Sequence, residues 1–254
     1  MDSQANSLRG TVSPEEWELR LDLACAYRLA AYYEWDDFVF THISARLPGT
    51  EGHFLLNPLD HLFEEITASS LVAIDGWGNK VRGGAEPINR AGFAIHSAIH
   101  RSREDAHCVV HLHTPEGQAV SAMKEGLLPL TQNAMLIRDD IAYHDYGGPV
   151  LAGDEAGRLL TALGDKHYML LRNHGILTLG STVGMALMRA FLLLRACHTQ
   201  VMALAAGRKG VILPEDKVIS DTAATANGMY DFLRDSAWPI LRRKMDRLDP
   251  GYRN

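Results

Sequence analysis

Apolar residues recur at helical spacing in several stretches of the chain, and these stretches alternate with short runs typical of β-strands. Ser13, Pro14 and the two glutamates that follow form a helix start, because a serine cap, an early proline and acids in the first turn all favour one. The pattern predicts helices at 14–33, 88–102, 115–125, 154–163 and 182–206. It predicts strands at 39–46, 53–56, 71–74, 108–113, 141–144 and 168–172.

Strand patterns on both sides of the helix at 88–102 indicate one α/β domain rather than two separate units. Residues 1–13 are polar and are predicted to form a flexible N-terminus, and residues 14–209 form the domain. Residues 210–254 mix charged and apolar positions. We expect them to form a helical tail that could pack on a neighbouring subunit.

Composition and charge narrow the class of protein. Of the 254 residues, 46% are hydrophobic and 22% are charged, which is typical of a globular domain. The formal net charge of -6 argues against nucleic-acid binding, because an acidic chain repels phosphate backbones. No apolar run approaches the roughly 20 residues of a membrane span, and no basic-then-apolar leader opens the chain, so we expect no membrane partner. The 3 cysteines, far apart and without a CxxC pair, favour a cytoplasmic location.

The chain contains 12 histidines, and two of them form an HxH pattern on an apolar strand. Alternation along the strand puts His111 and His113 on one face, where their rings can share one divalent ion. His174 is the best third donor, because it follows the strand at 168–172 and precedes a glycine turn. Uncoordinated core histidines are the alternative, but two desolvated imidazoles on one face need a partner, which favours a metal. Zinc is the first choice, and manganese and iron also accept three imidazoles.

Several motifs resemble the class II aldolase/adducin family. In chain order they are 91–100, 111–115, 119–123, 126–129, 142–146 and 172–175. They cover about residues 16–206 and are closer to the adducin head branch than to the sugar-phosphate aldolases. The resemblance implies a single three-layer αβα domain with a mixed, mainly antiparallel central sheet. It also implies a cyclic homotetramer with active sites near the subunit interfaces.

The resemblance assigns metal ligands but removes one residue that the aldolases use. Their zinc is held by an HxH pair and a later histidine, which match His111, His113 and His174. A glutamate that serves there as ligand and catalytic base falls on Gly92 here. The tyrosine that protonates the leaving group falls near Gln132 and has no clear match. Proton transfer must therefore come from another group.

The positions that bind phosphate in the aldolases also differ in this sequence. A Gly-Asn pair looks replaced by Thr41-His42, and a Thr-Gly pair falls on Leu59-Asp60. Glycine and hydroxyl residues cradle a phosphate dianion through N–H and O–H groups, whereas Asp60 would repel one. We therefore expect an unphosphorylated substrate.

Three residues are predicted to carry proton transfer. His96 lies four residues after Gly92 on the same helix stripe, Glu86 precedes that helix, and Tyr143 lies on a short aromatic strand. The ordinary alternatives are a packed helix histidine, a solvated acid and a core tyrosine.

Four further polar residues are predicted to bind substrate. His42 stands at a former phosphate position, and Ser44 follows it two residues later. Arg90, near the start of the helix, could pair with a substrate carboxylate, although a surface salt bridge is an equal alternative. Asn173 precedes the third histidine.

The leading functional prediction is a metal-dependent lyase or isomerase that acts through an enolate-like intermediate on a small, carboxylated and unphosphorylated carbonyl compound. The alternative is an adducin-like assembly or binding module that keeps a metal for stability and performs no chemistry. A hydrolase that uses metal-bound hydroxide ranks third, because no nucleophile with a base and an orienting group is evident.

Overall fold

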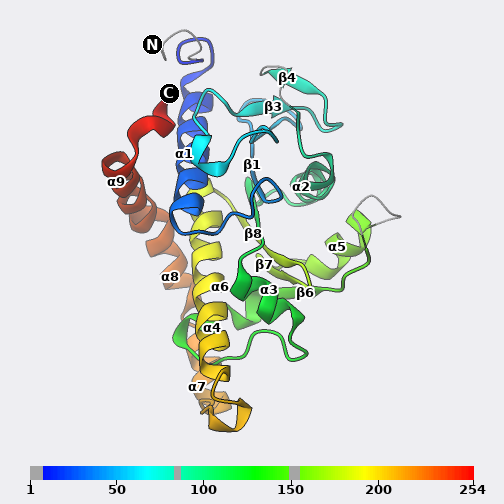
Figure 1. Cartoon of the computed structure of the whole chain (residues 1–254), viewed down its shortest axis with the longest axis vertical. Coiled ribbons are helices and arrows are strands. Elements are labelled where there is room, and N and C mark those ends of the chain that lie inside the picture. Colours follow the sequence, from blue (N-terminus) through cyan, green and yellow to red (C-terminus); the bar gives the residue numbers. More distant parts are fainter. Residues whose placement is uncertain (1–7, 83–86, 149–154) are drawn as a thin grey trace.

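The computed structural model describes residues 8–82, 87–148 and 155–254. In that part of the chain, one eight-stranded sheet has the order β4-β3-β2-β1-β5-β8-β7-β6. Neighbouring strands pair antiparallel except β6 and β7, which are parallel. Helices cover both faces of this sheet (Figure 1). The predicted fold class, an αβα domain with a mixed and mainly antiparallel sheet, is confirmed.

The first half of the chain builds α1 (Pro14–Tyr32) and one side of the sheet. The helix begins where predicted, since the Ser13 hydroxyl accepts a hydrogen bond from the Glu16 amide. The strand expected at 39–46 starts later, because Phe38 has a φ of 52° and its side chain is exposed. The strands are β1 (His42–Arg46), β2 (Phe54–Leu56), β3 (Val72–Ile74) and β4 (Lys80–Arg82), followed by α2 (Arg90–Ser102).

The second half adds the remaining strands and the long helix α6 (Val183–Leu204). The sequence pattern does not predict β8 (Gly175–Gly180), because every residue of this strand is buried and no alternation marks it. It also misses α4 (Gln132–Ile137), which is too short to show helical periodicity. The other elements lie within a few residues of the predicted ones: β5 (Cys108–Leu112), α3 (Pro115–Ala122), β6 (Ile141–His144), α5 (Glu155–Leu163) and β7 (Tyr168–Leu171).

The two faces of the sheet are covered by different helices (Figure 1). Helices α1, α3, α4 and α6 pack over one face, where Val110 and Leu112 of β5 join the larger apolar cluster. Helices α2 and α5 cover the other face, where Val109 of the same strand joins a smaller cluster. Strand alternation therefore places His111 on the face that α2 covers.

Much of the segment 210–254 is helical. The tail contains α7 (Asp216–Ala223), α8 (Ala226–Phe232) and α9 (Trp238–Leu248). It folds back on its own chain: the Trp238 indole N–H donates to the Asp22 carboxylate at 3.1 Å, and Tyr252 is fully buried. These contacts join the tail to its own chain, and its packing on a neighbouring subunit stays a prediction. Among the described residues, no helix combines the length and apolar character of a membrane span.

Candidate metal centre

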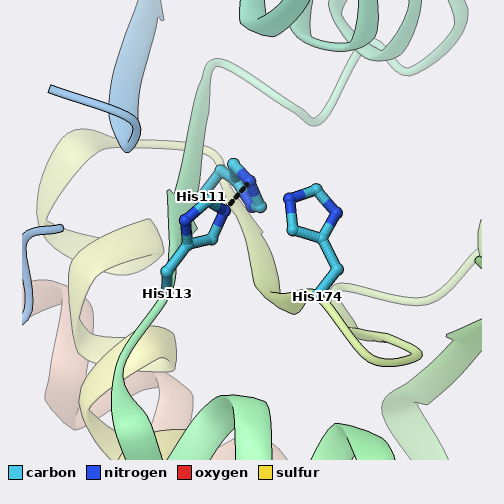
Figure 2. A group of neighbouring side chains, drawn as sticks. All are labelled: His111, His113 and His174. Carbon is cyan, nitrogen blue, oxygen red and sulfur yellow. Dashed lines mark hydrogen bonds between the residues drawn. The ribbon is translucent and has the colours of Figure 1, made fainter. Parts of the chain in front are cut away.

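Two of the three predicted ligands lie at the end of β5. His111 is on the strand, and His113 follows it directly. Their ring centroids are 4.6 Å apart, and the two Nε2 atoms are 2.9 Å apart. Figure 2 shows the two rings beside each other, with their interaction drawn as a dashed line.

His174 reaches the same place from the turn between β7 and β8. Asn173 has a φ of 58° in this turn, and the His174 amide donates to the Leu171 carbonyl at 3.0 Å. A Cβ on the next residue, Gly175, would lie 2.5 Å from the Leu112 carbonyl oxygen, so only glycine lets β8 approach β5 here. The His174 ring lies 4.9 Å from the His111 ring and 4.7 Å from the His113 ring.

The three rings form one candidate site (Figure 2). One nitrogen from each of His111, His113 and His174 lies within 4.8 Å of the others. Two nitrogens that share a tetrahedral zinc ion at 2.0–2.1 Å are roughly 3.3 Å apart, so small side-chain movements suffice to fit an ion. The structure thus brings together the three histidines that the sequence singles out.

Hydrogen bonds to their Nδ1 atoms orient two of the rings. The Nδ1 of His111 donates to the Ile176 carbonyl at 2.9 Å, and that of His113 lies 3.0 Å from a carboxylate oxygen of Asp37. Both contacts leave Nε2 free for a metal, which is how histidine ligands are usually oriented. Sequence reasoning missed Asp37. The available signal was an acidic residue shortly before β1, the strand that pairs with β5.

Burial favours the neutral form of His111 and His174. It lowers the pKa of His111 well below the usual 6.5, and the nearby histidines lower it further. Burial and His113 lower the pKa of His174 to about 4. A neutral imidazole has the lone pair that a metal requires, so these two rings can bind a cation at neutral pH.

His42, His96 and Ser44 lie together on the α2 side of the sheet, and all three are at most 5% exposed. His42 is paired with His111 in the β1–β5 register, and their ring centroids are 5.1 Å apart. His96 and Ser44 lie behind His42 and contact each other through a 2.7 Å hydrogen bond. Of these three, His42 is therefore the residue nearest to the candidate site.

Tyr143 does not join the histidines. It packs against the larger apolar cluster on the face opposite His111, and its hydroxyl accepts a hydrogen bond from the Leu127 amide at 3.1 Å. The guanidinium of Arg172 lies over its ring. Tyr143 thus lies against the apolar residues of that face, and its proposed part in proton transfer stays a prediction. The sequence predicts alternation on β6, but it does not tell which face receives the odd-numbered residues.

The remaining predicted residues have different placements. Asn173 is exposed in the turn that positions His174, and its left-handed backbone favours asparagine there. Arg90 begins α2, but its side chain lies outside the described part of the structure. Glu86 also lies outside the described residues.

Comparisons with known proteins agree with the fold. The family model described as "Class II Aldolase and Adducin N-terminal domain" matches residues 21–201. The chain is 50% identical, over 97% of its length and 96% of the relative's, to a Caulobacter vibrioides protein whose name places it in aldolase class 2. It is 42% identical over 81% of its length to mouse alpha-adducin, of which it matches 29%.

Solved structures give the same result. A crystal structure of an aldolase II superfamily protein from Pseudomonas syringae matches with a TM-score of 0.94 and 44% identity, covering 97% of this chain and 99% of the other. An L-fuculose 1-phosphate aldolase from Glaciozyma antarctica matches with a TM-score of 0.79 and 28% identity, covering 97% and 96%. The chain therefore belongs to the class II aldolase and adducin family.

Proposed function

We propose that the protein is a metal-dependent lyase or isomerase that stabilises an enolate-like charge on a small carbonyl compound. The observation that carries the proposal is the meeting of His111, His113 and His174, whose nitrogens lie within 4.8 Å of one another. These residues would hold one divalent ion, and the all-nitrogen donor set favours zinc, with manganese or iron as alternatives.

The chemistry follows from the charge of this donor set. Among the described residues, the group of possible ligands contains three imidazoles and no carboxylate. Three neutral ligands leave a divalent ion its full formal charge, whereas a glutamate at position 92 would halve it. When bound, such an ion supplies Lewis-acid stabilisation for negative charge on a carbonyl oxygen.

The proposed substrate is carboxylated and unphosphorylated. Asp60 and His42 stand where the resemblance expects a phosphate cradle, and an aspartate repels a phosphate dianion. Arg90 at the start of α2 and Asn173 in the turn before His174 are the proposed partners of a substrate carboxylate. The protein would then differ in substrate from the L-fuculose 1-phosphate aldolase that it resembles in fold.

A second candidate is an assembly module without catalysis. The 42% identity to alpha-adducin and the glycine at position 92 favour it. In that case the metal would stabilise the fold only, and chelation would lower the melting temperature of a protein that turns over no substrate.

Metal analysis followed by a substrate screen tests the proposal. We expect about one divalent ion per chain in the native protein, and loss of that ion in His111→Ala but not in the control His198→Ala, whose side chain is exposed on α6. The metal-loaded protein should convert at least one compound in a panel of hydroxy- and ketoacids. Absence of a bound ion would contradict the proposal, and metal-dependent stability without turnover would favour the assembly module.

We also propose that the protein forms a homotetramer in the cytoplasm, as the resemblance implies. Light scattering on the purified chain tests the assembly. A monomer at micromolar concentration would contradict it.

A further inference from the structure

The side chain of His42 fills the space beside Gly92. A Cβ built on Gly92 would lie 2.1 Å from the His42 Nε2 atom and 2.4 Å from its Cδ2 atom. No side chain larger than hydrogen fits at position 92 while His42 keeps this place. The imidazole from β1 thus stands where the resemblance would put a carboxylate from α2.

A chain of hydrogen bonds leads away from the other ring nitrogen of His42. Its Nδ1 lies 3.0 Å from the Nε2 of His96, and the Nδ1 of His96 lies 2.7 Å from the Ser44 hydroxyl. The same hydroxyl lies 2.7 Å from the Nε2 of His100. The Nδ1 of His100 ends the chain 2.8 Å from the Ala106 carbonyl oxygen.

The carbonyl at the end of this chain fixes every proton in it. A carbonyl only accepts, so the Nδ1 of His100 carries a proton. Burial lowers the pKa of His100 to about 3, so its ring is neutral and its Nε2 accepts from the Ser44 hydroxyl. Ser44 has one proton to give, so its oxygen accepts from the Nδ1 of His96. The Nε2 of His96 then accepts from the Nδ1 of His42, which leaves the Nε2 of His42 without a proton.

We propose that this unprotonated Nε2 of His42, held beside Gly92, accepts a hydrogen bond from a hydroxyl group of the ligand bound at His111, His113 and His174. The proposal rests on the proposed function and names its substrate class more closely: a hydroxylated acid or ketone. His42 is the cross-strand partner of His111, and the centroids of their rings are 5.1 Å apart.

The acceptor selects among ligands. A carboxylate or the dianion of a phosphate ester carries no proton and cannot donate to a lone pair, whereas a hydroxyl group can. A buried acceptor left without its donor costs free energy, so the site should discriminate against analogues that lack the hydroxyl.

The first experiment measures the proton positions directly. In metal-free protein labelled with ¹⁵N-histidine at neutral pH, two-bond ¹H–¹⁵N NMR correlations should show the Nδ1–H tautomer for His42, His96 and His100. Ser44→Ala removes the link between His96 and His100 and should give mixed tautomers for His42. The control Ser97→Ala removes a buried hydroxyl of α2 that donates to the Ala94 carbonyl outside the chain, and it should change nothing. A proton on the Nε2 of His42 in the native protein would overturn the inference.

The second experiment measures the ligand role by calorimetry with zinc-loaded protein. Glycolate carries a hydroxyl group, and acetate of similar size does not. His42→Phe keeps a ring beside Gly92 and removes the nitrogen, so the preference for glycolate over acetate should fall about tenfold, the value of one hydrogen bond. An unchanged preference would overturn the ligand role. Failure of the native protein to bind zinc would overturn the proposed function and the ligand role together, while the NMR result would still decide the proton positions.

Discussion

The strand β5 presents different chemistry to the two faces of the sheet. Toward α6 it presents Cys108, Val110 and Leu112, all fully buried in the larger apolar cluster. Toward α2 it presents Val109 and His111. Beside His111 lies His42 of β1, and beside His42 lies His96 of α2, and all three histidines are buried. All of these β5 residues are buried, but His111, toward α2, is the one of them whose side chain carries nitrogen.

The difference shows what each kind of burial requires. Apolar side chains gain from leaving water and need only close packing. Each buried imidazole needs hydrogen-bond partners, because an unpaired polar group in the interior costs roughly 1–3 kcal/mol. The pairs His42–His96, His96–Ser44 and Ser44–His100 meet that need, and they also fix the direction of the proton donors. We therefore expect the α6 face to determine stability and the α2 face to determine binding.

A cavity made on the α6 face should lower the stability of the protein most. Leu170 of β7 is fully buried in the larger cluster, so Leu170→Ala should lower the free energy of unfolding by about 3 kcal/mol. Urea denaturation with and without a chelator measures it. Leu248→Ala, at a half-exposed position of α9, is the control and should change stability by less than about 0.5 kcal/mol. Zinc affinity that fell together with stability would contradict the separation of the two faces.

Acid should act on the α2 face with a somewhat smaller effect. Burial lowers the pKa of His100 from 6.5 to about 3. Below about pH 6.5 the unfolded chain takes up a proton that the folded chain does not, so stability is complete near pH 7 and falls as the pH decreases toward 3. Between pH 7.5 and 5 this one histidine removes about 2 kcal/mol. Burial lowers the pKa of His42 and His96 as well, in the same direction.

Urea denaturation of metal-free protein at pH 7.5, 6 and 5 tests this dependence. Leu170→Ala is a useful reference, because its loss of stability should be the same at each pH if the α6 face contributes no titration. Equal stability of the native protein at pH 7.5 and pH 5 would show that the histidines of the α2 face accept protons freely.

The two faces also differ in how far the sequence predicts them. Alternation along one strand and the position of His174 at the end of another are enough to predict that His111, His113 and His174 lie together. The place of His42 depends on the β1–β5 register and on how closely α2 approaches β1, and neither follows from a local pattern. The face that Tyr143 occupies does not follow from the sequence either, since alternation on an edge strand does not tell which side is the inner one.

The substitution Asp37→Asn should weaken zinc binding without lowering stability, and its expected effect is the smallest of those predicted. Asp37 lies in the segment before β1, and its carboxylate accepts from the Nδ1 of His113 at 3.0 Å. Its side chain is 46% exposed, so we expect the lower end of the usual range for such a partner, about a tenfold loss of zinc affinity, roughly 1.4 kcal/mol. With chelator present, the free energy of unfolding should change by less than about 0.5 kcal/mol.

Two comparisons identify how Asp37 acts. Asp36→Asn makes the same charge change one residue away and should leave zinc affinity within about twofold, because exposed charges are strongly screened. Asparagine keeps an oxygen that can accept from His113, whereas Asp37→Ala removes the acceptor. If the negative charge beside the His113 ring matters, Asp37→Asn and Asp37→Ala should lose similar zinc affinity. If orientation of the ring alone matters, only Asp37→Ala should lose zinc affinity. Native affinity in all three variants would show that the histidines hold the ion without help from this loop.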